Sequence, residues 1–494
     1  KCGDLGKAKA MFDELYLIRD VILWNALISG YSQHGLGNEA LDLFRQMQEE
    51  GLLPDVVTLS CILKACGSVG LGNKGEEIHC AMRKEKPYRR NIVLRTSLVD
   101  MYAKCGKLET AREVFDEFPM HDVALWNALI SGYAQHGHSD EAMKCFDHMI
   151  AEGLSPDVIT FACILKACGN MVSEEMGRKV HAEVQKQGLL GKNPVLGTAL
   201  IDMYAKCGSL EKAREVFNEL SVHNVISWNT LISSYAKEGL LEEALSCIRR
   251  MRKQGLTPDA ISFACIIKSC GSIGSMELGE KLHTQVKQQG LLENNNLMLG
   301  TALIDMYAKC GMMRKAKQVF DDLLETDIIC WNVLITGYAQ RGEVKEVFAC
   351  FDKMLAAGLI VPNMVTFMIL LSACSHAGLV EEGEAYFYTM DRVYTLTPTL
   401  EHYTSVVDLL GRAGQFEEAL ISFEKVPCSN RLEMLVSFLG ACRKWVNVSL
   451  GRWAFENAIK LDGRCAGIYV CMSNIYAVVG MREEADKVEA LGKQ

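Results

Sequence analysis

The feature that most constrains this chain is an internal repeat. An eleven-residue string around Trp-Asn occurs as VILWNALISGY from Val21, VALWNALISGY from Val123, VISWNTLISSY from Val225 and IICWNVLITGY from Ile328. The successive starts lie 102, 102 and 103 residues apart. Self-similarity at a fixed period indicates an array of stacked units. It therefore replaces the about three globular domains that the length of 494 residues would otherwise suggest.

Each long period divides into three related units of about 35, 36 and 31 residues. In the first unit, Trp24, Leu27 and Ile28 recur at helical spacing, glycines follow, and a second amphipathic stretch begins near Ala40. One such hairpin cannot bury its apolar stripe alone, whereas stacked hairpins share a continuous core. We therefore predict an all-α fold, a right-handed α-solenoid superhelix of stacked helix-turn-helix repeats whose first helices line the concave side.

The predicted boundaries follow from the repeated strings. A partial unit covers 1–20, and a tail of helical repeats covers 431–494. The twelve complete units between them run 21–55, 56–91, 92–122, 123–157, 158–193, 194–224, 225–259, 260–296, 297–327, 328–363, 364–399 and 400–430. The unit 328–363 carries one extra residue near its end, in GLIVPN.

The recurring aromatic and cysteine residues are interpreted as packing residues. They stand at fixed helical positions beside Leu and Ile, which is typical of a core and not of a base-stacking surface. Twenty cysteines recur in strings such as MYAKCG and LKAC, which indicates small buried side chains in a reducing compartment. The aromatic positions are Trp24, Trp126, Trp228, Trp331, Tyr102, Tyr204 and Tyr307.

No apolar run reaches the 18 or more residues that a membrane span needs, so we expect no membrane partner. The first residues, KCGDLGKA, match the interior of the later string MYAKCGKLETA. We therefore expect that the sequence begins inside a repeat and that a targeting segment is not part of it.

The strings resemble the pentatricopeptide repeat proteins of plants, in the class that alternates standard, long and short repeats. WNALISGYAQHG with EAMKCFDHMIAEGLSPD is similar to a standard repeat, VITFACILKAC with GRKVHAEVQKQG to a long one, and GTALIDMYAKCGSLEKAREVFNEL to a short one. The stretch from about 431, with LGACR and SNIYAVVG, resembles the E-type tail of that class. The resemblance covers essentially the whole chain.

The resemblance implies single-stranded RNA as the partner, with the fifth and last residues of a repeat selecting one base. An ionised Asp only accepts hydrogen bonds, which suits the N–H of uracil or guanine, whereas an Asn amide also donates. The fifth residue then sorts base size, Thr with purines and Asn with pyrimidines. The pairs in standard repeats are Asn25 with Asp55, Asn127 with Asp157, Asn229 with Asp259 and Asn332 with Asn363; those in short repeats are Thr96 with Asp122, Thr198 with Asn224, Thr301 with Asp327 and Thr404 with Asn430.

These pairs predict a target of approximately 5′-UnGUnAUnGCnA. The long repeats supply weaker readers, because two of them hold Ala and one holds Met at the fifth position. Their pairs are Ser60 with Asn91, Ala162 with Asn193, Ala264 with Asn296 and Met368 with Thr399. The resemblance also implies an apolar second residue that inserts between neighbouring bases, here Ile22, Val93, Ala124, Ile226 and Ile329.

The Asn and Asp residues have a second interpretation, because both are favoured caps at helix N-termini. Capping alone does not explain why Asn recurs at the fifth position of standard repeats and Thr in short ones. We therefore favour base readout, and capping stays open as the alternative.

The net charge of −9 opposes binding to phosphate when it is taken as a whole. Its distribution weakens this objection. In the triplet 123–224 the first helices carry Lys166 and Lys206 against Asp202, although the triplet holds nine basic and twelve acidic residues. The predicted groove is thus weakly basic, and binding should depend on base contacts more than on phosphate contacts.

The chain is expected not to be an enzyme and to hold no metal or cofactor. The string His181-Ala182-Glu183 matches the first half of the zinc deaminase signature by chance, and no Cys-x-x-Cys follows Pro427-Cys428. Gly70 to Gly75 match a dinucleotide fingerprint, but no strand precedes them, so we interpret them as an inter-helix loop.

Three functions compete at this stage. The mixed repeat classes and the tail imply a monomeric site-recognition factor for C-to-U RNA editing in the mitochondrion or chloroplast, with the deaminase supplied elsewhere or by a partner that docks on 431–494. A second possibility is an organelle RNA-binding protein for transcript stability, splicing or processing. A third is a protein-binding helical scaffold, which the unequal unit lengths disfavour.

Overall fold

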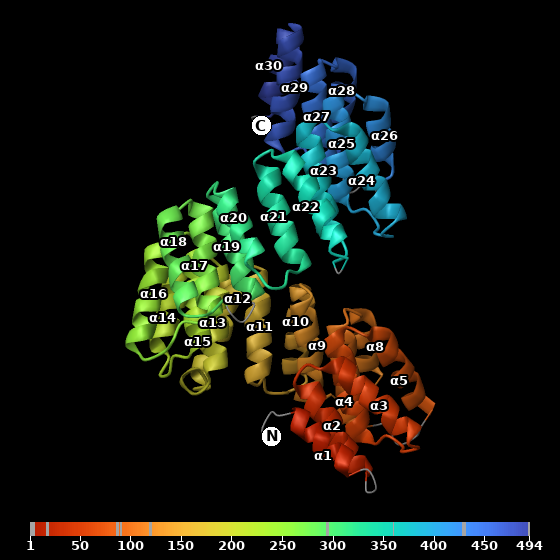
Figure 1. Cartoon of the computed structure of the whole chain (residues 1–494), viewed down its shortest axis with the longest axis vertical. Coiled ribbons are helices and arrows are strands. Elements are labelled where there is room, and N and C mark those ends of the chain that lie inside the picture. Colours follow the sequence, from red (N-terminus) through yellow and green to blue (C-terminus); the bar gives the residue numbers. More distant parts are fainter. Residues whose placement is uncertain are drawn as a thin grey trace. The chain divides into compact units, whose positions relative to one another are not determined.

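The computed structural model describes residues 5–15, 19–84, 88, 91–117, 121–292, 296–358, 360–426 and 431–492, and it is α-helical with no strand in these ranges (Figure 1). The chain divides into two compact units. The first comprises residues 1–238 and 246–257, and the second comprises 239–245 and 258–494. The division runs through α16 (Leu241–Lys253). An α-solenoid of helical hairpins is therefore the observed fold, as the repeat pattern predicts.

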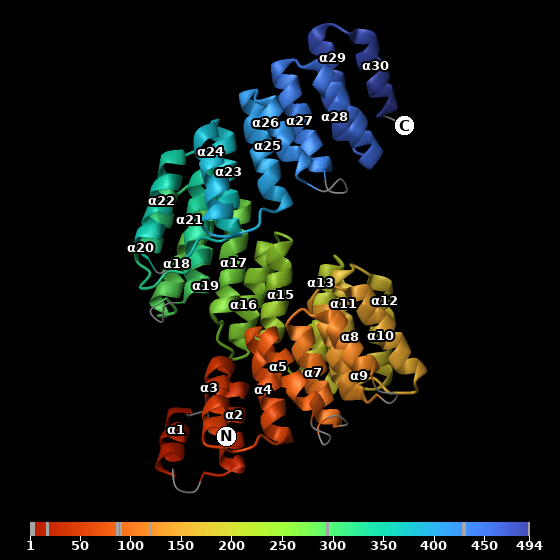
Figure 2. The same ribbon diagram turned by 90° about the vertical axis from the view of Figure 1, so that its right-hand side faces the viewer.

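In the first unit, pairs of antiparallel helices follow one another along the chain (Figure 2). Its helices are α1 (Leu5–Glu14), α2 (Val21–Gln33), α3 (Gly37–Glu49), α4 (Val56–Val69), α5 (Gly72–Lys84), α7 (Ile92–Lys104), α8 (Leu108–Asp116), α9 (Val123–Gln135), α10 (Ser139–Ala151), α11 (Val158–Asn170), α12 (Glu174–Lys186), the short 3-10 helix η2 (Leu190–Lys192), α13 (Pro194–Lys206), α14 (Leu210–Glu219) and α15 (Val225–Lys237).

The second unit continues the same pattern into the tail. Its helices are α17 (Ala260–Ile273), α18 (Met276–Gln288), α19 (Leu297–Lys309), α20 (Met313–Asp321), α21 (Ile328–Gln340), α22 (Val344–Ala356), α23 (Met364–Ala377), α24 (Val380–Arg392), α25 (Leu400–Ala413), α26 (Phe416–Glu424), α27 (Leu432–Trp445), α28 (Val448–Leu461), α29 (Ala466–Val479) and α30 (Arg482–Leu491). In both units the first helix of every predicted repeat begins at the first residue of that repeat.

Local sequence signals explain these boundaries. The residue before each first helix is an Asp, Asn or Thr; Asp55, for example, caps α4 by accepting a hydrogen bond from the Thr58 backbone N–H at 2.8 Å. At the other end of α4, Gly70 has φ +77°, a left-handed conformation that a residue without a Cβ adopts without strain.

Packing places the first helices in a continuous row within each unit. Each first helix contacts its own second helix and the first helix of the following repeat, for example α4 with α5 and α7, and α19 with α20 and α21. The approach is close where small residues meet, because a Cβ added to Gly132 on α9 would overlap the Ala103 side chain on α7. The first helices of a unit therefore form one surface, on which equivalent positions of neighbouring repeats lie in register.

The aromatic side chains of the repeat strings form the core between repeats. Trp24 and Trp228 are fully buried, and the rings of Phe217 and Trp228 lie 4.5 Å apart between centroids. Trp126, Trp331, Tyr102, Tyr204 and Tyr307 are also buried. These side chains pack inside the array and are not exposed for stacking on a ligand, as the sequence pattern predicts.

A histidine–tyrosine hydrogen bond joins each of the first three long repeats to the short repeat that follows it. The second helix of the long repeat supplies the histidine, and the first helix of the short repeat supplies the tyrosine. The Nδ1 to hydroxyl distance is 2.9 Å in all three cases, His79 with Tyr102, His181 with Tyr204 and His283 with Tyr307. Burial lowers the pKa of each histidine and raises the pKa of each tyrosine, so both groups are neutral at pH 7 and share a neutral hydrogen bond.

Every cysteine in the described part of the chain is a free thiol. Burial raises the pKa of Cys66, Cys168 and Cys270 to about 11, as expected of packing residues. None of the described helices is long and apolar enough to span a membrane.

Candidate functional site

In the first standard repeat, the fifth and last residues meet although 30 positions separate them. Asn25, on α2, donates from Nδ2 to both carboxylate oxygens of Asp55, at 2.9 and 3.0 Å. Thr58, in the first turn of α4, donates from its hydroxyl to Asn25 Oδ1 at 2.5 Å. Asn25 is only 8% exposed, whereas Asp55 is half-buried. The three side chains form a polar cluster that joins the standard repeat to the long repeat.

The same cluster recurs in two other standard repeats. Asn127 donates to Asp157 at 3.0 Å and accepts from the Thr160 hydroxyl at 2.6 Å. In the second unit, Asn332 donates to Asn363 Oδ1 at 3.2 Å and accepts from the Thr366 hydroxyl at 2.8 Å. The extra residue in the string GLIVPN therefore leaves the pairing of Asn332 with Asn363 intact. Asn229 and Asp259 belong to different units; Asp259 caps α17 and Asn229 is buried on α15.

The last residues of the repeats are N-caps, so the capping interpretation holds. In each of them the side-chain oxygen Oδ1 accepts a backbone N–H of the next first helix. The set comprises Asp55, Asn91, Asp122, Asp157, Asn193, Asn224, Asp259, Asn296, Asp327 and Asn363. Thr399 caps α25 within a capping box with His402, and Asn430 lies outside the described residues.

Capping does not consume the whole side chain. With Oδ1 held by the helix N-terminus, the second atom of the head group is Oδ2 in Asp and Nδ2 in Asn. The cap thus decides which atom of the head group remains for another partner. An Asp offers a second acceptor, and an Asn offers a donor.

The fifth residues of the short repeats are arranged differently. Each threonine donates its hydroxyl to the backbone carbonyl four residues earlier in its own helix. The bonds are Thr96 to Ile92 at 3.0 Å, Thr198 to Pro194 at 2.8 Å, Thr301 to Leu297 at 2.6 Å and Thr404 to Leu400 at 2.9 Å. The proton is therefore committed locally, and the hydroxyl oxygen keeps its capacity to accept. All four threonines are more exposed than the asparagines of the standard repeats, in the half-buried range.

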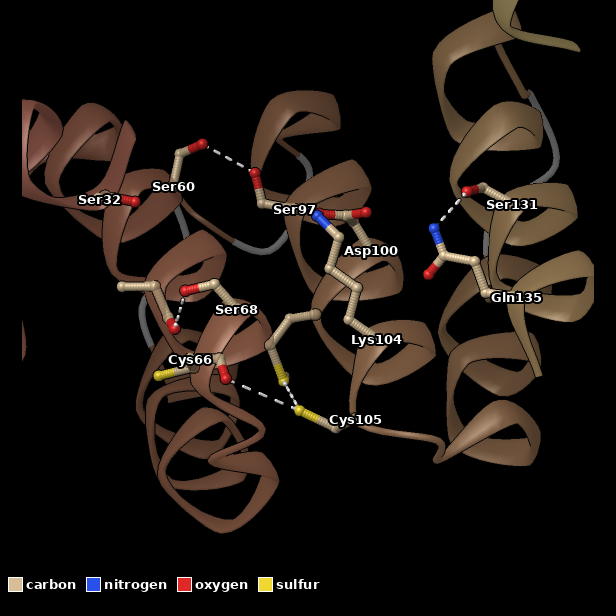
Figure 3. Close-up of polar contacts among 12 residues, drawn as sticks. Ser32, Ser60, Cys66, Ser68, Ser97, Asp100, Lys104, Cys105, Ser131 and Gln135 are labelled. Atoms are coloured by element: carbon tan, nitrogen blue, oxygen red, sulfur yellow. Dashed lines mark hydrogen bonds and ion pairs between the residues drawn. The ribbon is translucent and has the colours of Figure 1, made fainter. Parts of the chain in front are cut away.

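The long repeats offer weaker groups at the fifth position. Ser60 is buried and shares a hydrogen bond with Ser97 of the next repeat at 2.8 Å (Figure 3). Ala264 is buried, while Ala162 and Met368 are half-buried. These side chains hold no polar group free of the neighbouring repeat, in keeping with the expectation of weak readers.

Apolar side chains at the second position of the first helices are exposed to solvent. Ile22 is 74% exposed and Ile226 is 65% exposed, although the residues beside them are half-buried or buried. Val93, Ala124 and Ile329 are also exposed, and so are Val57, Ile159, Val195, Ile261, Met298 and Val365 at the same position of other repeats. Exposed aliphatic residues repeated at one position are unexplained by folding and mark a contact surface.

These positions gather in open hollows on the row of first helices. In the first unit a hollow of about 370 Å³ is lined by residues of four consecutive repeats, among them Thr96, Asp122, Asn127, Val93, Ala124 and Ser60. In the second unit a hollow of about 290 Å³ is lined by Asn332, Asn363, Ile329, Val365 and Asp305 among others. Within each unit the structure thus brings predicted fifth, last and second residues of adjacent repeats to the row of first helices, and we call this surface of either unit the first-helix groove.

The basic side chains of this surface are largely paired. Lys104 contacts Asp100 at 2.7 Å, one turn earlier on α7 (Figure 3). Lys206 with Asp202, Lys309 with Asp305, and Arg412 with Asp408 repeat the arrangement at 2.7 to 2.9 Å. Lys64, Lys166 and Lys268 of the long repeats are exposed on the same row. The surface carries charges of both signs, in line with the weakly basic groove that the sequence predicts.

The carboxylates of two standard-repeat clusters are held ionised. Partial burial alone would raise the pKa of Asp55, but hydrogen bonds from the Thr58 backbone and the Asn25 side chain outweigh it and lower that pKa. Asp157 has its pKa lowered in the same way by Thr160 and Asn127. Both side chains therefore act as acceptors throughout the physiological pH range.

Sequence reasoning missed the threonines that follow the last residues. Thr58, Thr160 and Thr366 each stand three residues after the cap, in the strings DVVT, DVIT and NMVT. This spacing is that of a capping box, in which cap and third helical residue bond reciprocally, and the structure shows that bond in all three. The signal was present, but it gave no indication of the further bond to the fifth residue.

One loop prediction was wrong. Only Gly70 and Leu71 link α4 to α5, and residues 72–75 form the first turn of α5, because the left-handed Gly70 ends one helix and the next starts at once. His181 and Glu183 lie on the second helix α12, as expected. Pro427 and Cys428 lie outside the described residues. No cluster of three or more metal-ligating side chains occurs within the described ranges.

Comparison with known proteins finds matches to repeat models along the chain. A model described as "PPR repeat family" matches residues 19–68, 121–170, 223–272 and 326–376, and one described as "PPR repeat" matches 93–123, 198–225, 301–328, 365–393 and 401–430. The chain is 35% identical over its whole length to Pentatricopeptide repeat-containing protein At2g03380, mitochondrial, and 36% identical over 99% of its length to At1g11290, chloroplastic, both from Arabidopsis thaliana.

The chain spans 71% of the first of these relatives and 60% of the second. Among solved structures, the pentatricopeptide repeat protein PPR10 in complex with an 18-nt psaJ RNA element superposes with a TM-score of 0.51. The identity is 18%, and the match covers 98% of this chain and 82% of that one, so the likeness concerns the fold. The family models and the relatives together show that this chain belongs to the pentatricopeptide repeat family.

Proposed function

We propose that this chain binds single-stranded RNA in a sequence-specific manner, with one base read by each standard or short repeat. The observation that carries the proposal is the first-helix groove, where an oriented donor or acceptor and an exposed apolar side chain recur in the standard and short repeats. The exception is the repeat 400–430. Its second residue is Glu401, and its last residue lies outside the described residues. Proteins read unpaired RNA by stacking its bases and by hydrogen bonds to their edges.

The exposed second residues supply the stacking part. A side chain such as Ile22 or Ile226 can insert between two consecutive bases and separate them, because its apolar surface is open to the groove. The last residue then meets the edge of the base. Asp55, Asp157 and Asp259 select U, Asn363 selects C, Asp122 and Asp327 select G, and Asn224 and Asn430 select A.

The proposed target is 5′-UnGUnAUnGCnA, in which n marks a base opposite a long repeat. Two observations support the proposal that the bases marked n are not read. Ser60 is hydrogen-bonded to Ser97, and Ala264 is buried. The solved relative in complex with an 18-nt RNA supports RNA as the class of partner.

We further propose that the chain serves C-to-U RNA editing in the mitochondrion or chloroplast as the factor that locates the site. The alternation of standard, long and short repeats and the E-type features of 431–494 support this role, and the names of the relatives support an organelle. The deaminase would act from another domain or from a partner on the tail. A role in RNA stability or processing would use the same groove.

A gel-shift with the full chain tests RNA binding directly. We expect the oligonucleotide carrying 5′-UnGUnAUnGCnA to bind at least tenfold more tightly than a scrambled RNA of the same composition. Equal binding of the two would overturn both RNA functions and leave a protein-binding scaffold. The slope of log affinity against log salt should be shallower than about −6, since paired lysines leave few phosphate contacts.

A further inference from the structure

We propose that the hydroxyl in the third position of the following long repeat, on Thr58, Thr160 and Thr366, is a specificity-positioning group for the standard repeats. This inference rests on the proposed RNA binding. It assigns to these threonines the task of fixing the amide orientation of the fifth residue, and with it the pattern of donors and acceptors that meets the base.

The hydrogen bonds around Thr58 leave a single arrangement for the Asn25 amide. The Thr58 oxygen accepts the Asp55 backbone N–H at 3.1 Å, so its one proton is directed to an acceptor. The shortest acceptor contact is Asn25 Oδ1 at 2.5 Å. A rotation of the amide by 180° would place Oδ1 against the Asp55 carboxylate, two acceptors without a proton between them. The Thr58 hydroxyl also lies 2.9 Å from Asp55 Oδ1, but its shorter contact is to Asn25. The carboxylate therefore holds Nδ2 and the Thr58 hydroxyl holds Oδ1, and the two together fix the amide.

This orientation defines what the base meets in a standard repeat. Asn25 Nδ2 lies 2.9 and 3.0 Å from the two oxygens of Asp55, and we infer that one N–H is shared between them and that the second N–H meets the base beside the carboxylate. A donor beside an acceptor matches a uracil edge, where the N3–H lies beside a carbonyl oxygen. Cytosine would place the lone pair of its N3 against the carboxylate. Selection of U over C thus needs both the ionised Asp55 and the fixed amide.

The repeat that ends in Asn363 shows the complementary pattern. Asn363 Oδ1 accepts from Asn332 at 3.2 Å and from the Thr366 backbone at 3.1 Å, while the Thr366 hydroxyl proton is directed to Asn332 Oδ1 at 2.8 Å. The oxygen is fully engaged inside the cluster, so Nδ2 is the atom left for the base. Two amide donors side by side match the N3 and carbonyl acceptors of cytosine. The same threonine position therefore supports U in one repeat and C in another.

The short repeat 194–224 provides a natural contrast, because the capping-box hydroxyl that follows it is bonded to Asn224 and not to the fifth residue. After the repeat 194–224, Ser227 forms a capping box with Asn224: it accepts the Asn224 backbone N–H at 3.1 Å and donates to the Asn224 carbonyl at 2.9 Å. The fifth residue, Thr198, bonds to its own helix. Ser227 thus caps a helix as Thr58 does without contacting a fifth residue.

The experiment measures base selectivity at one nucleotide at a time with the full chain. Four RNAs that differ only at the first position of 5′-UnGUnAUnGCnA are titrated against the unmodified protein, T58V and T58S. We expect T58V to reduce the preference for U over C at that position about tenfold, and T58S to keep it within twofold because the hydroxyl remains. Selectivity at the other positions should be unchanged. T160V repeats the test at its own nucleotide.

The matched control is S227A. It removes a capping-box hydroxyl of the same kind, and we expect the preference for A over G opposite 194–224 to stay within twofold. If T58V and T160V weaken binding to all four RNAs equally, the threonines are helix caps only and the proposal is wrong. If the unmodified chain shows no preference at any position, the proposed RNA function fails first and this inference with it. Thermal melting of each variant separates loss of fold from loss of selectivity.

Discussion

Standard and short repeats use the same helical hairpin and the same N-cap, yet they treat the fifth residue in opposite ways. In standard repeats the asparagine is buried and bonded across the junction, as Asn127 is to Asp157 and Thr160. In short repeats the threonine is half-buried and bonded within its own helix, as Thr198 is to Pro194. The fifth position is thus part of the junction in one class and a surface side chain in the other.

This difference shows that the fifth position contributes more to stability in standard repeats than in short repeats, although we propose that it contacts a base in both. Asn127 belongs to a network in which Asp157 and Thr160 each lose one hydrogen bond if its side chain is removed. Thr198 can be exchanged with little effect on its neighbours. The standard repeats are therefore expected to tolerate less change at the reading position than the short repeats.

The largest expected effect breaks this comparison directly. N127A removes one hydrogen bond to Asp157 and one from Thr160, and since a hydrogen bond contributes about 0.5–1.5 kcal/mol we expect a loss of about 1–3 kcal/mol. We expect the opening free energy that hydrogen exchange measures in α9 and α11 to fall by this amount. T198A removes one hydroxyl that is bonded to its own helix. The opening free energy measured by hydrogen exchange in α13 should then change by no more than about 0.5 kcal/mol. Equal effects of the two variants would contradict the contrast.

A smaller effect is expected at the junction between long and short repeats, which the His–Tyr bond holds instead. Y204F deletes the hydroxyl that lies 2.9 Å from His181 and leaves the ring packing unchanged. A neutral hydrogen bond contributes about 0.5–1.5 kcal/mol, so we expect a loss of about 1 kcal/mol measured by hydrogen exchange in α13. A loss above that measured for N127A would reverse the proposed order of the junctions.

The smallest expected effect is a difference in the pH dependence of stability between the two kinds of junction. Burial lowers the folded-state pKa of His79, His181 and His283 below the ordinary 6.5, so stability is complete above about pH 6.5 and falls as the pH drops toward the folded values. Asp55 and Asp157 have pKa values below 3.8, so their contribution persists until the pH falls through those lowered values. Hydrogen exchange should therefore report a lower stability of α13 at pH 5 than at pH 7, and the same stability of α11 at both pH values. The reverse order would contradict these assignments.

The sequence predicted the helical hairpins because their signals are local. The spacing of Trp24, Leu27 and Ile28 and the caps such as Asp55 act within a few residues, so the repeat starts coincide with helix starts. It also predicted which positions share a surface, since stacked repeats repeat their geometry. Gly72 was misplaced in a loop because a two-residue link and a long loop contain the same residue types.

Contacts across a junction were harder to predict. Asn25 and Thr58 are 33 residues apart, and their bond depends on how two helices pack, which no local pattern states. Capping and readout were treated as rival roles for Asp55, whereas the structure shows that the cap orients the group available for reading. The self-bonded hydroxyl of Thr198 was likewise invisible, because it depends on a side-chain rotamer.

The most direct test of base selection by the last residue is N224D with the four RNAs that vary opposite the repeat 194–224. Asp caps a helix as Asn does, and its Oδ1 can accept the Ser227 backbone N–H as Asn224 does at 2.8 Å, so the fold should be retained. The change replaces the outward donor with an acceptor. We predict that the preferred base changes from A to G, with affinity for the other positions unchanged. A preference that stays at A would contradict selection by the last residue.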